Sequence, residues 1–332
     1  MSATSQPDGG GRGLPPAPVE RIRILYIGGW GRSGSTLLDR MVGQVPGFVS
    51  VGELRDIWQR GWVENRLCGC GAPFHDCPFW TKVGQEAFGG WEQADPEEMA
   101  RLRYAVDRPW HLPYLLRPSL SAGYRRRARR YVDGLDRLYR AILSVSGAQV
   151  LIDSSKIPTY ALLLRQLESV DLRILHLVRD SRGVVFSWQK QVQRPDASAE
   201  PDFMLRYGVA GASVRYLVYN GLTRALRRLG LPYLLLRYED AVRDPRAALV
   251  AAVEHSGVPL PDDLPHLGDG EVALGVGHTV DGNPMRFDTG TVVLRVDEAW
   301  RDGLSDKHTA AVTAITYPLL RRYGYRRTGQ AS

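Results

Sequence analysis

The sequence predicts an α/β fold of three layers, with a central parallel sheet and a helical insertion. Short apolar runs typical of fully buried strands alternate with segments that carry helix-start signals. Alternation of this kind gives right-handed crossovers, and therefore a parallel sheet covered by helices on both faces. Between about residues 56 and 147 the alternation stops. That stretch is rich in Trp, Arg and Tyr, and we expect it to be a helical insertion and not an independent domain.

The strand candidates are four apolar runs, at residues 22–27, 149–152, 172–178 and 233–236. Helices are expected directly after Gly34 and over 159–167, 181–190, 245–255 and 305–322. Ligands of such sheets bind beyond the carboxyl ends of the strands. The residues that follow the first three strands, 28–34, 153–156 and 179–182, are therefore expected to converge on one site.

Composition limits the class of protein. The chain has 332 residues and 44% hydrophobic content, enough for one large domain, which we place at residues 20–328. Residues 1–19 are rich in Gly and Pro and lack an apolar run, so we expect a disordered tail and not a signal peptide. No apolar stretch reaches the length of a membrane span, and we expect a cytoplasmic protein.

The net charge of +7 comes mostly from arginine, which supplies 39 of the 43 basic residues. No nucleic-acid-binding motif is present, so we expect no nucleic-acid partner. A basic chain also suits a doubly phosphorylated nucleotide. The oligomeric state cannot be predicted.

The most informative segment is residues 24–38, a buried strand that ends in a glycine-rich turn before a helix. Gly29, Gly31 and Gly34 allow backbone N–H groups to point at one anion, and the helix start adds its positive dipole end. This is a P-loop NTPase-like pattern, but Ser35 stands where a Walker A loop has its lysine. The basic side chain comes earlier, as Arg32. A phosphate ester other than a nucleoside triphosphate is therefore favoured.

A second segment repeats the strand–turn–helix pattern at residues 173–188. Arg179 ends the strand and Ser187 lies two turns into the helix, so both side chains can reach one phosphate.

Together the two segments closely resemble the sulfotransferases that use 3′-phosphoadenylyl sulfate (PAPS), over roughly residues 22–55, 150–190 and 232–300. The resemblance implies that the first loop holds the 5′-phosphosulfate, through Gly31, Arg32, Ser33, Gly34, Ser35 and Thr36. It also implies that Arg179 and Ser187 hold the 3′-phosphate. Tyr238 matches a segment near the adenine, although it could also be a core residue. Arg286 and Arg295 are further candidates for the 3′-phosphate.

Sulfuryl transfer needs a base for the acceptor hydroxyl and cations for the transferring and leaving oxygens. Glu53 is the candidate base, as in the tyrosylprotein and many bacterial sulfotransferases that the chain resembles. The alternative is that Glu53 caps a helix or pairs with Arg55. Arg32 and Lys156 are the candidate catalytic cations, the latter matching a lysine that assists the leaving group. Lys156 could instead be a surface residue.

Other candidates are weaker. His278 is a rival base, and His176, inside an apolar strand, is expected in the core. Asp153 ends a strand as a Walker B aspartate does, but no metal is expected to be required. Cys68, Cys70 and Cys77 crowd into one loop with His75, where they could bind zinc, although C-x-C is tighter than usual zinc spacing. Packed reduced thiols are the alternative we favour, and a cytoplasmic compartment disfavours a disulfide.

We therefore expect a sulfotransferase that moves a sulfuryl group from PAPS to a hydroxyl of a small-molecule, glycan or lipid acceptor. The rival functions are a P-loop small-molecule kinase and a catalytically silent nucleotide-binding protein. The insertion at 56–147 is expected to form the acceptor lid, with aromatic walls drawn from its five tryptophans, Trp58, Trp62, Trp80, Trp91 and Trp110.

Overall fold

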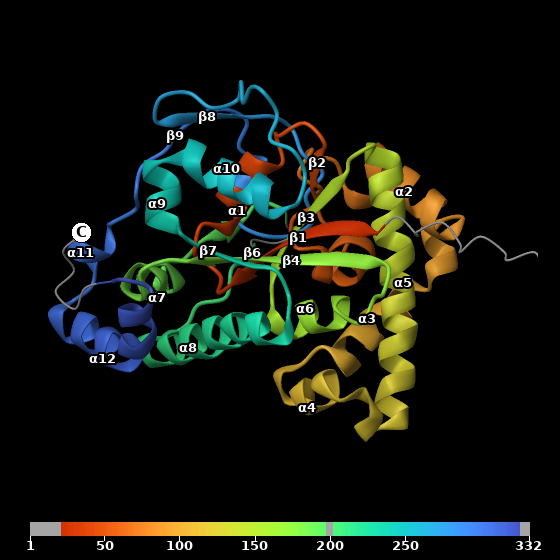
Figure 1. Cartoon of the computed structure of the whole chain (residues 1–332), viewed down its shortest axis with the longest axis horizontal. Coiled ribbons are helices and arrows are strands. Elements are labelled where there is room, and N and C mark those ends of the chain that lie inside the picture. Colours follow the sequence, from red (N-terminus) through yellow and green to blue (C-terminus); the bar gives the residue numbers. More distant parts are fainter. Residues whose placement is uncertain (1–20, 197–201, 326–332) are drawn as a thin grey trace, which may run out of the picture.

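The structure, a computed structural model, describes residues 21–196 and 202–325. The expected tail over 1–19 and the domain end at 328 lie outside these residues. A five-stranded sheet of order β2-β3-β1-β4-β7 forms the centre (Figure 1), and every neighbouring pair is parallel. Its strands are β1 (Ile22–Gly29), β2 (Phe48–Ser50), β3 (Val150–Lys156), β4 (Val170–Val178) and β7 (Tyr233–Arg237). The predicted α/β fold is confirmed.

Side chains of β1 alternate between the two faces of the sheet, as the period of a strand requires. Ile24 and Tyr26 belong to one hydrophobic core, and Leu25 and Ile27 belong to the other. In Figure 1, α1 (Ser35–Val42), α9 (Tyr238–Arg243) and α10 (Pro245–His255) lie above the sheet. Below it lie α6 (Pro158–Leu164), α7 (Ser181–Gln189), α8 (Val209–Ala225) and α12 (Asp306–Arg322). The layers are therefore helix, sheet and helix.

Local signals explain where several helices start. The Asp180, Asp244 and Ser305 side chains accept hydrogen bonds from backbone N–H groups in the first turns of α7, α10 and α12. Proline occupies the first position of α6 and α10. The predicted helices 159–167, 181–190, 245–255 and 305–322 are all present, with ends that differ by up to three residues.

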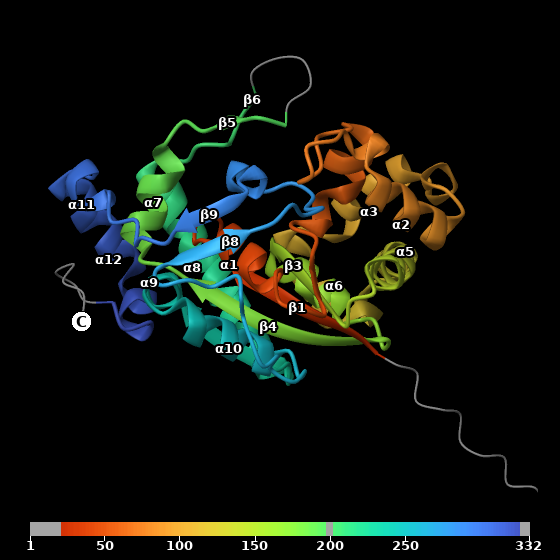
Figure 2. The same ribbon diagram turned by 90° about the horizontal axis from the view of Figure 1, so that it is seen from above.

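Only helices fill the insertion between β2 and β3, as predicted, and Figure 2 shows them gathered at one end of the sheet. They are η1 (Leu54–Asp56), the π-helix η2 (Ile57–Val63), η3 (Phe74–Asp76), α2 (Pro78–Phe88), η4 (Trp91–Ala94), α3 (Pro96–Val106), η5 (Pro109–His111), α4 (Leu112–Leu116), η6 (Pro118–Leu120) and α5 (Ala122–Ser146). The longest, α5, packs against α2 and α3. The insertion shares one hydrophobic core with the sheet, so it is part of the same domain.

Two small antiparallel ribbons flank the sheet's carboxyl edge. They are β5 (Gln193–Arg194) with β6 (Asp202–Phe203), and β8 (Glu271–Leu274) with β9 (Gly290–Val293). The remaining short helices are η7 (Leu226–Leu229), η8 (Pro284–Phe287) and α11 (Trp300–Gly303). Within the described residues, no helix combines the length and apolarity that crossing a bilayer demands.

Candidate active site

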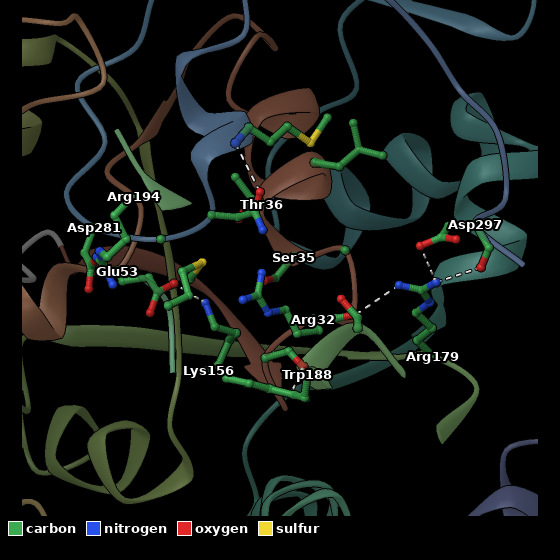
Figure 3. A pocket seen from close by; sticks show the side chains of 18 of the residues that line it. Arg32, Ser35, Thr36, Glu53, Lys156, Arg179, Trp188, Arg194, Asp281 and Asp297 are labelled. Carbon is green, nitrogen blue, oxygen red and sulfur yellow. Dashed lines mark hydrogen bonds and ion pairs between the residues drawn. The ribbon is translucent and has the colours of Figure 1, made fainter. Parts of the chain in front are cut away.

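A cavity of about 770 Å³ opens where β1, β3, β4 and β7 end, and Figure 3 shows its side chains. Its wall includes residues from all the segments that the sequence predicted to converge. Gly31, Arg32, Gly34, Ser35 and Thr36 come from the first loop. The wall also holds Glu53, Lys156, Arg179, Ser187, Tyr238 and Arg295. Residues far apart in the sequence thus meet at one edge of the sheet, as parallel strands dictate.

The glycine-rich loop is packed so closely that larger residues would not fit. A Cβ on Gly34 would lie 2.4 Å from Cδ2 of Tyr238, and Gly34 has a φ of 86°. A Cβ on Gly31 would lie 2.7 Å from Cζ2 of Trp188, whose indole N–H donates to the Gly31 carbonyl over 3.1 Å. The glycines therefore let the loop turn tightly between two aromatic rings and present its backbone to the cavity.

Arg32 is the cation of this loop. Its backbone is left-handed, with a φ of 68°, and its guanidinium lies 5.1 Å from the centre of the Trp188 ring. Nε and Nη2 are buried and have no hydrogen-bond partner among the described residues. Burial lowers the pKa of Arg32 from its usual value. Buried donors without an acceptor are costly, so this guanidinium is well suited to receive an anion.

Glu53 and Lys156 form an ion pair across the cavity from the loop. Lys156 Nζ lies 2.6 Å from Glu53 Oε1 and also donates to the Ser154 carbonyl over 2.9 Å. Burial raises the pKa of Glu53 above that of an ordinary carboxyl group, while Lys156 acts in the opposite direction. A carboxyl group with a raised pKa is suited to accept a proton near neutral pH.

The alternatives for these residues do not hold. Glu53 precedes η1, but its side chain makes no capping hydrogen bond. Arg55 instead bonds to Asp107 and lies 3.6 Å from Asp56. Lys156 is not a surface residue, since its side chain is only 11% exposed. Asp153 is fully buried and accepts hydrogen bonds from Ser155 and Tyr139, away from the cavity wall.

Backbone strain concentrates at this site. In the described chain, positive φ angles occur at five residues other than glycine, and three of them line the cavity: Arg32, Lys156 and Asp281. Such conformations are costly for residues with a Cβ, and they persist where surrounding structure enforces them. Their gathering around one cavity singles it out as the candidate functional site on grounds other than the sequence motifs.

Arg179 lies at the other end of the cavity, above the Tyr238 ring at 4.7 Å. It donates to the carbonyl oxygens of Arg32 (3.2 Å) and Asp297 (2.7 Å), and its Nη2 lies 3.0 Å from Oδ2 of Asp297. Figure 3 shows this carboxylate directed at the guanidinium. The Asp297 carboxylate thus occupies the position in which a phosphate would accept hydrogen bonds from the same N–H groups of Arg179.

Several charged residues of the wall were not predicted. They are Arg60, Arg66, Arg194, Asp202, Asp281 and Asp297, all in loops or short elements. Arg194 bonds to Asp281, and Arg66 lies 2.8 Å from Asp202. Counted over the described residues, the wall carries seven basic side chains and four acidic ones, which favours an anionic ligand.

Two residues expected to bind the donor lie elsewhere. Arg286 is outside this cavity and 2% exposed, and it donates to the carbonyls of Thr279 (2.7 Å) and Leu67 (2.6 Å) and to Asp196 (3.1 Å). It is a buried structural residue, so its assignment to the 3′-phosphate is corrected. The Ser33 side chain is buried and donates to Trp30. Of the two C-terminal candidates for the 3′-phosphate, Arg286 and Arg295, Arg295 is the one that lines the cavity.

The two candidate histidines, His176 and His278, both lie outside the cavity wall. His176 is buried in the core as expected, between Tyr233 (2.5 Å) and Asn220 (2.9 Å), and burial lowers its pKa to about 4. His278, the rival base, lies outside the cavity wall. It meets Cys68, Cys70 and Cys77, which were expected to gather with His75.

The expected aromatic lid is not formed by the insertion's tryptophans. Trp58, Trp80 and Trp91 are buried in the core, and Trp110 is 68% exposed. None of the five lines the cavity, to which the insertion contributes only Arg60 and Arg66. The apolar wall comes instead from residues 203–205 and 292–294 and from Leu37 and Met285. Four of these tryptophans, all except Trp110, pack in or against the core, a role that sequence alone could not separate from ligand binding.

Comparisons with known proteins identify the family of the chain. The model of the sulfotransferase family matches residues 25–262. No curated protein matches the chain. The sulfotransferase domain from the olefin synthase of Synechococcus PCC 7002 is 19% identical, with a TM-score of 0.48, and the alignment covers 93% of this chain and 98% of that domain. The sulfotransferase STF9 from Mycobacterium avium is 16% identical, with a TM-score of 0.45 and coverage of 95% and 79%. Since the family match runs from β1 beyond β7 and takes in most of the chain, this protein belongs to the sulfotransferase family.

Proposed function

We propose that the protein transfers a sulfuryl group from PAPS to a hydroxyl group of an acceptor, leaving adenosine 3′,5′-bisphosphate. One observation carries the proposal: the Arg32 guanidinium, whose Nε and Nη2 have no hydrogen-bond partner among the described residues, lines the same cavity as the Glu53–Lys156 pair. An anion-binding loop, a buried carboxylate with a raised pKa and an ammonium group beside it are the parts that in-line sulfuryl transfer needs.

The described residues fit the donor's two anionic ends. Gly31, Arg32, Gly34, Ser35 and Thr36 would hold the phosphosulfate, because the loop turns its backbone toward the cavity and Arg32 has donors to spare. Arg179, Ser187 and Arg295 would hold the 3′-phosphate, which would replace the Asp297 carboxylate on Arg179. Tyr238 packs between the loop and Arg179 and would separate the two ends.

The donor supplies a sulfuryl group already bonded to a phosphate leaving group. Glu53 would remove the proton of the acceptor hydroxyl as the new sulfur–oxygen bond forms. Lys156 would donate to the bridging oxygen that leaves with the bisphosphate, while its charge keeps Glu53 ionised. Arg32 would stabilise the charge on the transferring oxygens. The products are the sulfate ester and the bisphosphate, and the proton ends on Glu53.

The acceptor would enter beside Glu53 from the side lined by Phe203, Met204 and Leu205. Leu205 is 71% exposed, so an apolar surface leads to the cavity mouth. Arg60 and Arg66, also on this wall, would suit polar or acidic groups of the same acceptor. This mixture is compatible with a small molecule, a glycan or a lipid headgroup.

The rival functions lack support at this site. A kinase that uses ATP needs a lysine on the β/γ-phosphates, and Ser35 occupies that position. A silent nucleotide-binding protein would have no use for a buried base and its cation, yet Glu53 and Lys156 are paired here.

Thermal shift measurements can test the donor assignment. Adenosine 3′,5′-bisphosphate should raise the melting temperature, whereas ATP with magnesium should have little effect. Arg179→Ala should remove most of the gain. Arg173→Ala, on strand β4, which directly precedes Arg179, is the matched control and should keep the gain, because Arg173 pairs with Asp171 and does not line the cavity. Equal stabilisation by ATP would contradict the proposal. In a second experiment, sulfur-labelled PAPS is incubated with fractions of a pooled extract of hydroxylated compounds. Failure to label any fraction would also contradict the proposal.

A further inference from the structure

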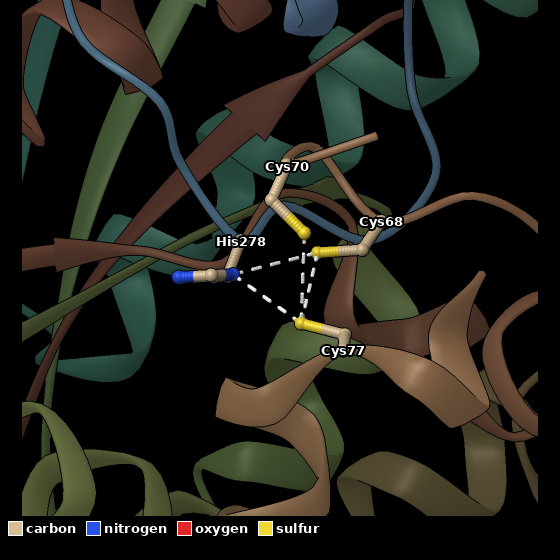
Figure 4. Close-up of side chains that lie close together, drawn as sticks. All are labelled: Cys68, Cys70, Cys77 and His278. Atoms are coloured by element: carbon tan, nitrogen blue, oxygen red, sulfur yellow. Dashed lines mark hydrogen bonds between the residues drawn. The ribbon is translucent and has the colours of Figure 1, made fainter. Parts of the chain in front are cut away.

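Three thiols and one imidazole converge outside the cavity, as Figure 4 shows. Cys68, Cys70 and Cys77 come from the start of the insertion, and His278 comes from a loop about 200 residues later in the chain. The four candidate ligand atoms, three Sγ and the His278 Nδ1, all lie within 4.8 Å of one another. His75, the nearest histidine in sequence, faces elsewhere, with Nε2 at 2.8 Å from the Trp62 carbonyl.

Four of the six separations match the edges of a zinc tetrahedron, and the other two, from Cys70 Sγ to Cys68 Sγ and to His278 Nδ1, lie within 4.8 Å. Bonds of about 2.3 Å to sulfur and about 2.05 Å to nitrogen place two sulfurs about 3.8 Å apart, and a sulfur and a nitrogen about 3.6 Å apart. In the structure, Cys77 Sγ lies 3.6 Å from Cys68 Sγ and 3.7 Å from Cys70 Sγ. The His278 Nδ1 lies 3.7 Å from Cys68 Sγ and 3.4 Å from Cys77 Sγ. One atom at the centre can therefore reach all four ligands.

Neither alternative explains this arrangement as well. A disulfide requires sulfurs about 2.05 Å apart, and three cysteines would leave one unpaired. Thiols that only fill a core need no convergence on a nitrogen, and Cys70 is not fully buried. Three thiolates and one imidazole make a Cys₃His set, which is a usual composition for structural zinc.

The surrounding residues fix the ligands in place. The His278 ring stacks on Phe79 at 4.7 Å between centroids, and the Trp80 indole N–H donates to the His278 carbonyl over 3.1 Å. The Gly69 N–H donates to the Thr279 carbonyl over 3.0 Å. A Cβ on Gly69 would lie 2.5 Å from the Thr279 hydroxyl, so only glycine allows the two loops to approach this closely. Such outer contacts orient metal ligands in known sites.

We propose that Cys68, Cys70, Cys77 and His278 bind one structural zinc ion that ties the start of the insertion to the loop at 278–282. The loop is directly linked to the base. The Val280 N–H donates to the Val51 carbonyl over 2.8 Å, and the Glu53 N–H donates to the Val280 carbonyl over 2.9 Å. The ion thus holds the backbone of Glu53 through His278. All four protein ligands are supplied by the chain, so the site is closed and serves folding, not the transfer reaction.

The zinc content of the purified full-length chain tests the proposal directly. Protein expressed without added metal and passed through a desalting column should contain one equivalent of zinc by elemental analysis. A thiol-blocking reagent should release that zinc to a colorimetric chelator. Cobalt exchanged into the site should give the intense absorption of thiolate-to-cobalt charge transfer. Protein with less than a tenth of an equivalent, or an intact-mass measurement showing a disulfide, would overturn the proposal.

Two histidine variants separate this site from a zinc site that would use His75, the histidine next to the cysteines in sequence. His278→Asn should lower the bound zinc at least tenfold on dialysis against a moderate chelator. His75→Asn, the same change in the same cysteine loop, should retain a full equivalent. The reverse pattern, or equal retention by both variants, would refute the role of His278. Because the wild-type zinc content is measured first, failure of a variant to fold leaves the test intact.

Discussion

Glu53→Gln is the substitution that most directly tests the proposed chemistry. The amide keeps the size of the side chain and an oxygen that can still accept from Lys156, which lies 2.6 Å from Oε1 in the native pair. It removes only the capacity to take a proton. Since Glu53 is not part of the glycine-rich loop, and Arg32 and Arg179 are unchanged, the binding of adenosine 3′,5′-bisphosphate should stay within a few-fold of the native value.

The expected loss in turnover is about 10²–10⁴-fold, the usual contribution of a positioned base. At about 1.36 kcal/mol for each factor of ten, this equals about 3–5 kcal/mol of transition-state stabilisation. The loss in the free energy of unfolding should be smaller than this loss of transition-state stabilisation. Lys156 keeps its hydrogen bond to Ser154 and loses only a charged partner. The cost to stability should be about 1–3 kcal/mol, the range for hydrogen bonds to charged groups.

The pH dependence distinguishes a base from a structural residue. Burial raises the pKa of Glu53, so the native rate should rise with pH as this carboxyl group ionises, with a midpoint above that of an ordinary glutamate. In Glu53→Gln the residual rate should be flat across the same window. The assay is transfer of label from sulfur-labelled PAPS to the active fraction of an acceptor extract, measured between about pH 5 and 8.

Glu98→Gln is the matched control. Its carboxylate also pairs with basic side chains, Arg101 (2.9 Å) and Arg130 (3.2 Å), but none of the three residues lines the cavity, so turnover should change by only a few-fold. A Glu53→Gln enzyme with near-native turnover, or one whose rate keeps the native pH dependence, would refute the assignment of Glu53 as the base.

Three further substitutions test other parts of the structure. Asp297→Asn should tighten bisphosphate binding several-fold in titration calorimetry, because a carboxylate that competes for Arg179 is lost; weaker binding would contradict this. Gly34→Ala should abolish the bisphosphate-induced thermal shift, since its Cβ would lie 2.4 Å from Tyr238, and an unchanged shift would show that the loop tolerates a side chain. Burial raises the pKa of Asp39 to about 7, so the folded state binds a proton more tightly than the unfolded chain and loses stability as pH rises toward and through 7. Asp39→Asn should therefore raise the free energy of unfolding at pH 8 by up to a few kcal/mol, since each pKa unit corresponds to about 1.4 kcal/mol. At pH 5 the effect should be much smaller. Urea denaturation at the two pH values measures both effects, and equal effects would contradict the reasoning.

The parts of the site that could be predicted from the sequence are those that directly follow strands. Arg32, Lys156 and Arg179 each come within a few residues of a buried apolar run, and the carboxyl ends of parallel strands share one edge. Glu53 follows the short strand β2 in the same way. For these residues, local pattern and sheet topology together determine position.

Residues in the long loops could not be placed in this manner. Arg286, in η8, and Arg295, just after β9, lie nine positions apart, and only the tertiary fold directs the first into the protein interior and the second to the cavity. Likewise, His75 adjoins the cysteines in sequence, but the distant His278 meets their sulfurs. Arg194 and Asp281 form their pair across 87 positions, a contact that no local pattern encodes.

The insertion has a topological consequence beyond its packing. Strands β2 and β3 are neighbours in the sheet. Glu53 follows β2 and Lys156 ends β3, yet the whole insertion lies between the two strands. A crossover between parallel strands needs only a dozen or so residues. The parts of this connection that do not pack in the shared core are therefore free to differ without altering the strand pairing that sets Glu53 beside Lys156. Exchange of the exposed turn at η6, where Leu116 and Leu120 face solvent, is expected to remodel the protein's outer surface while these two residues stay in register.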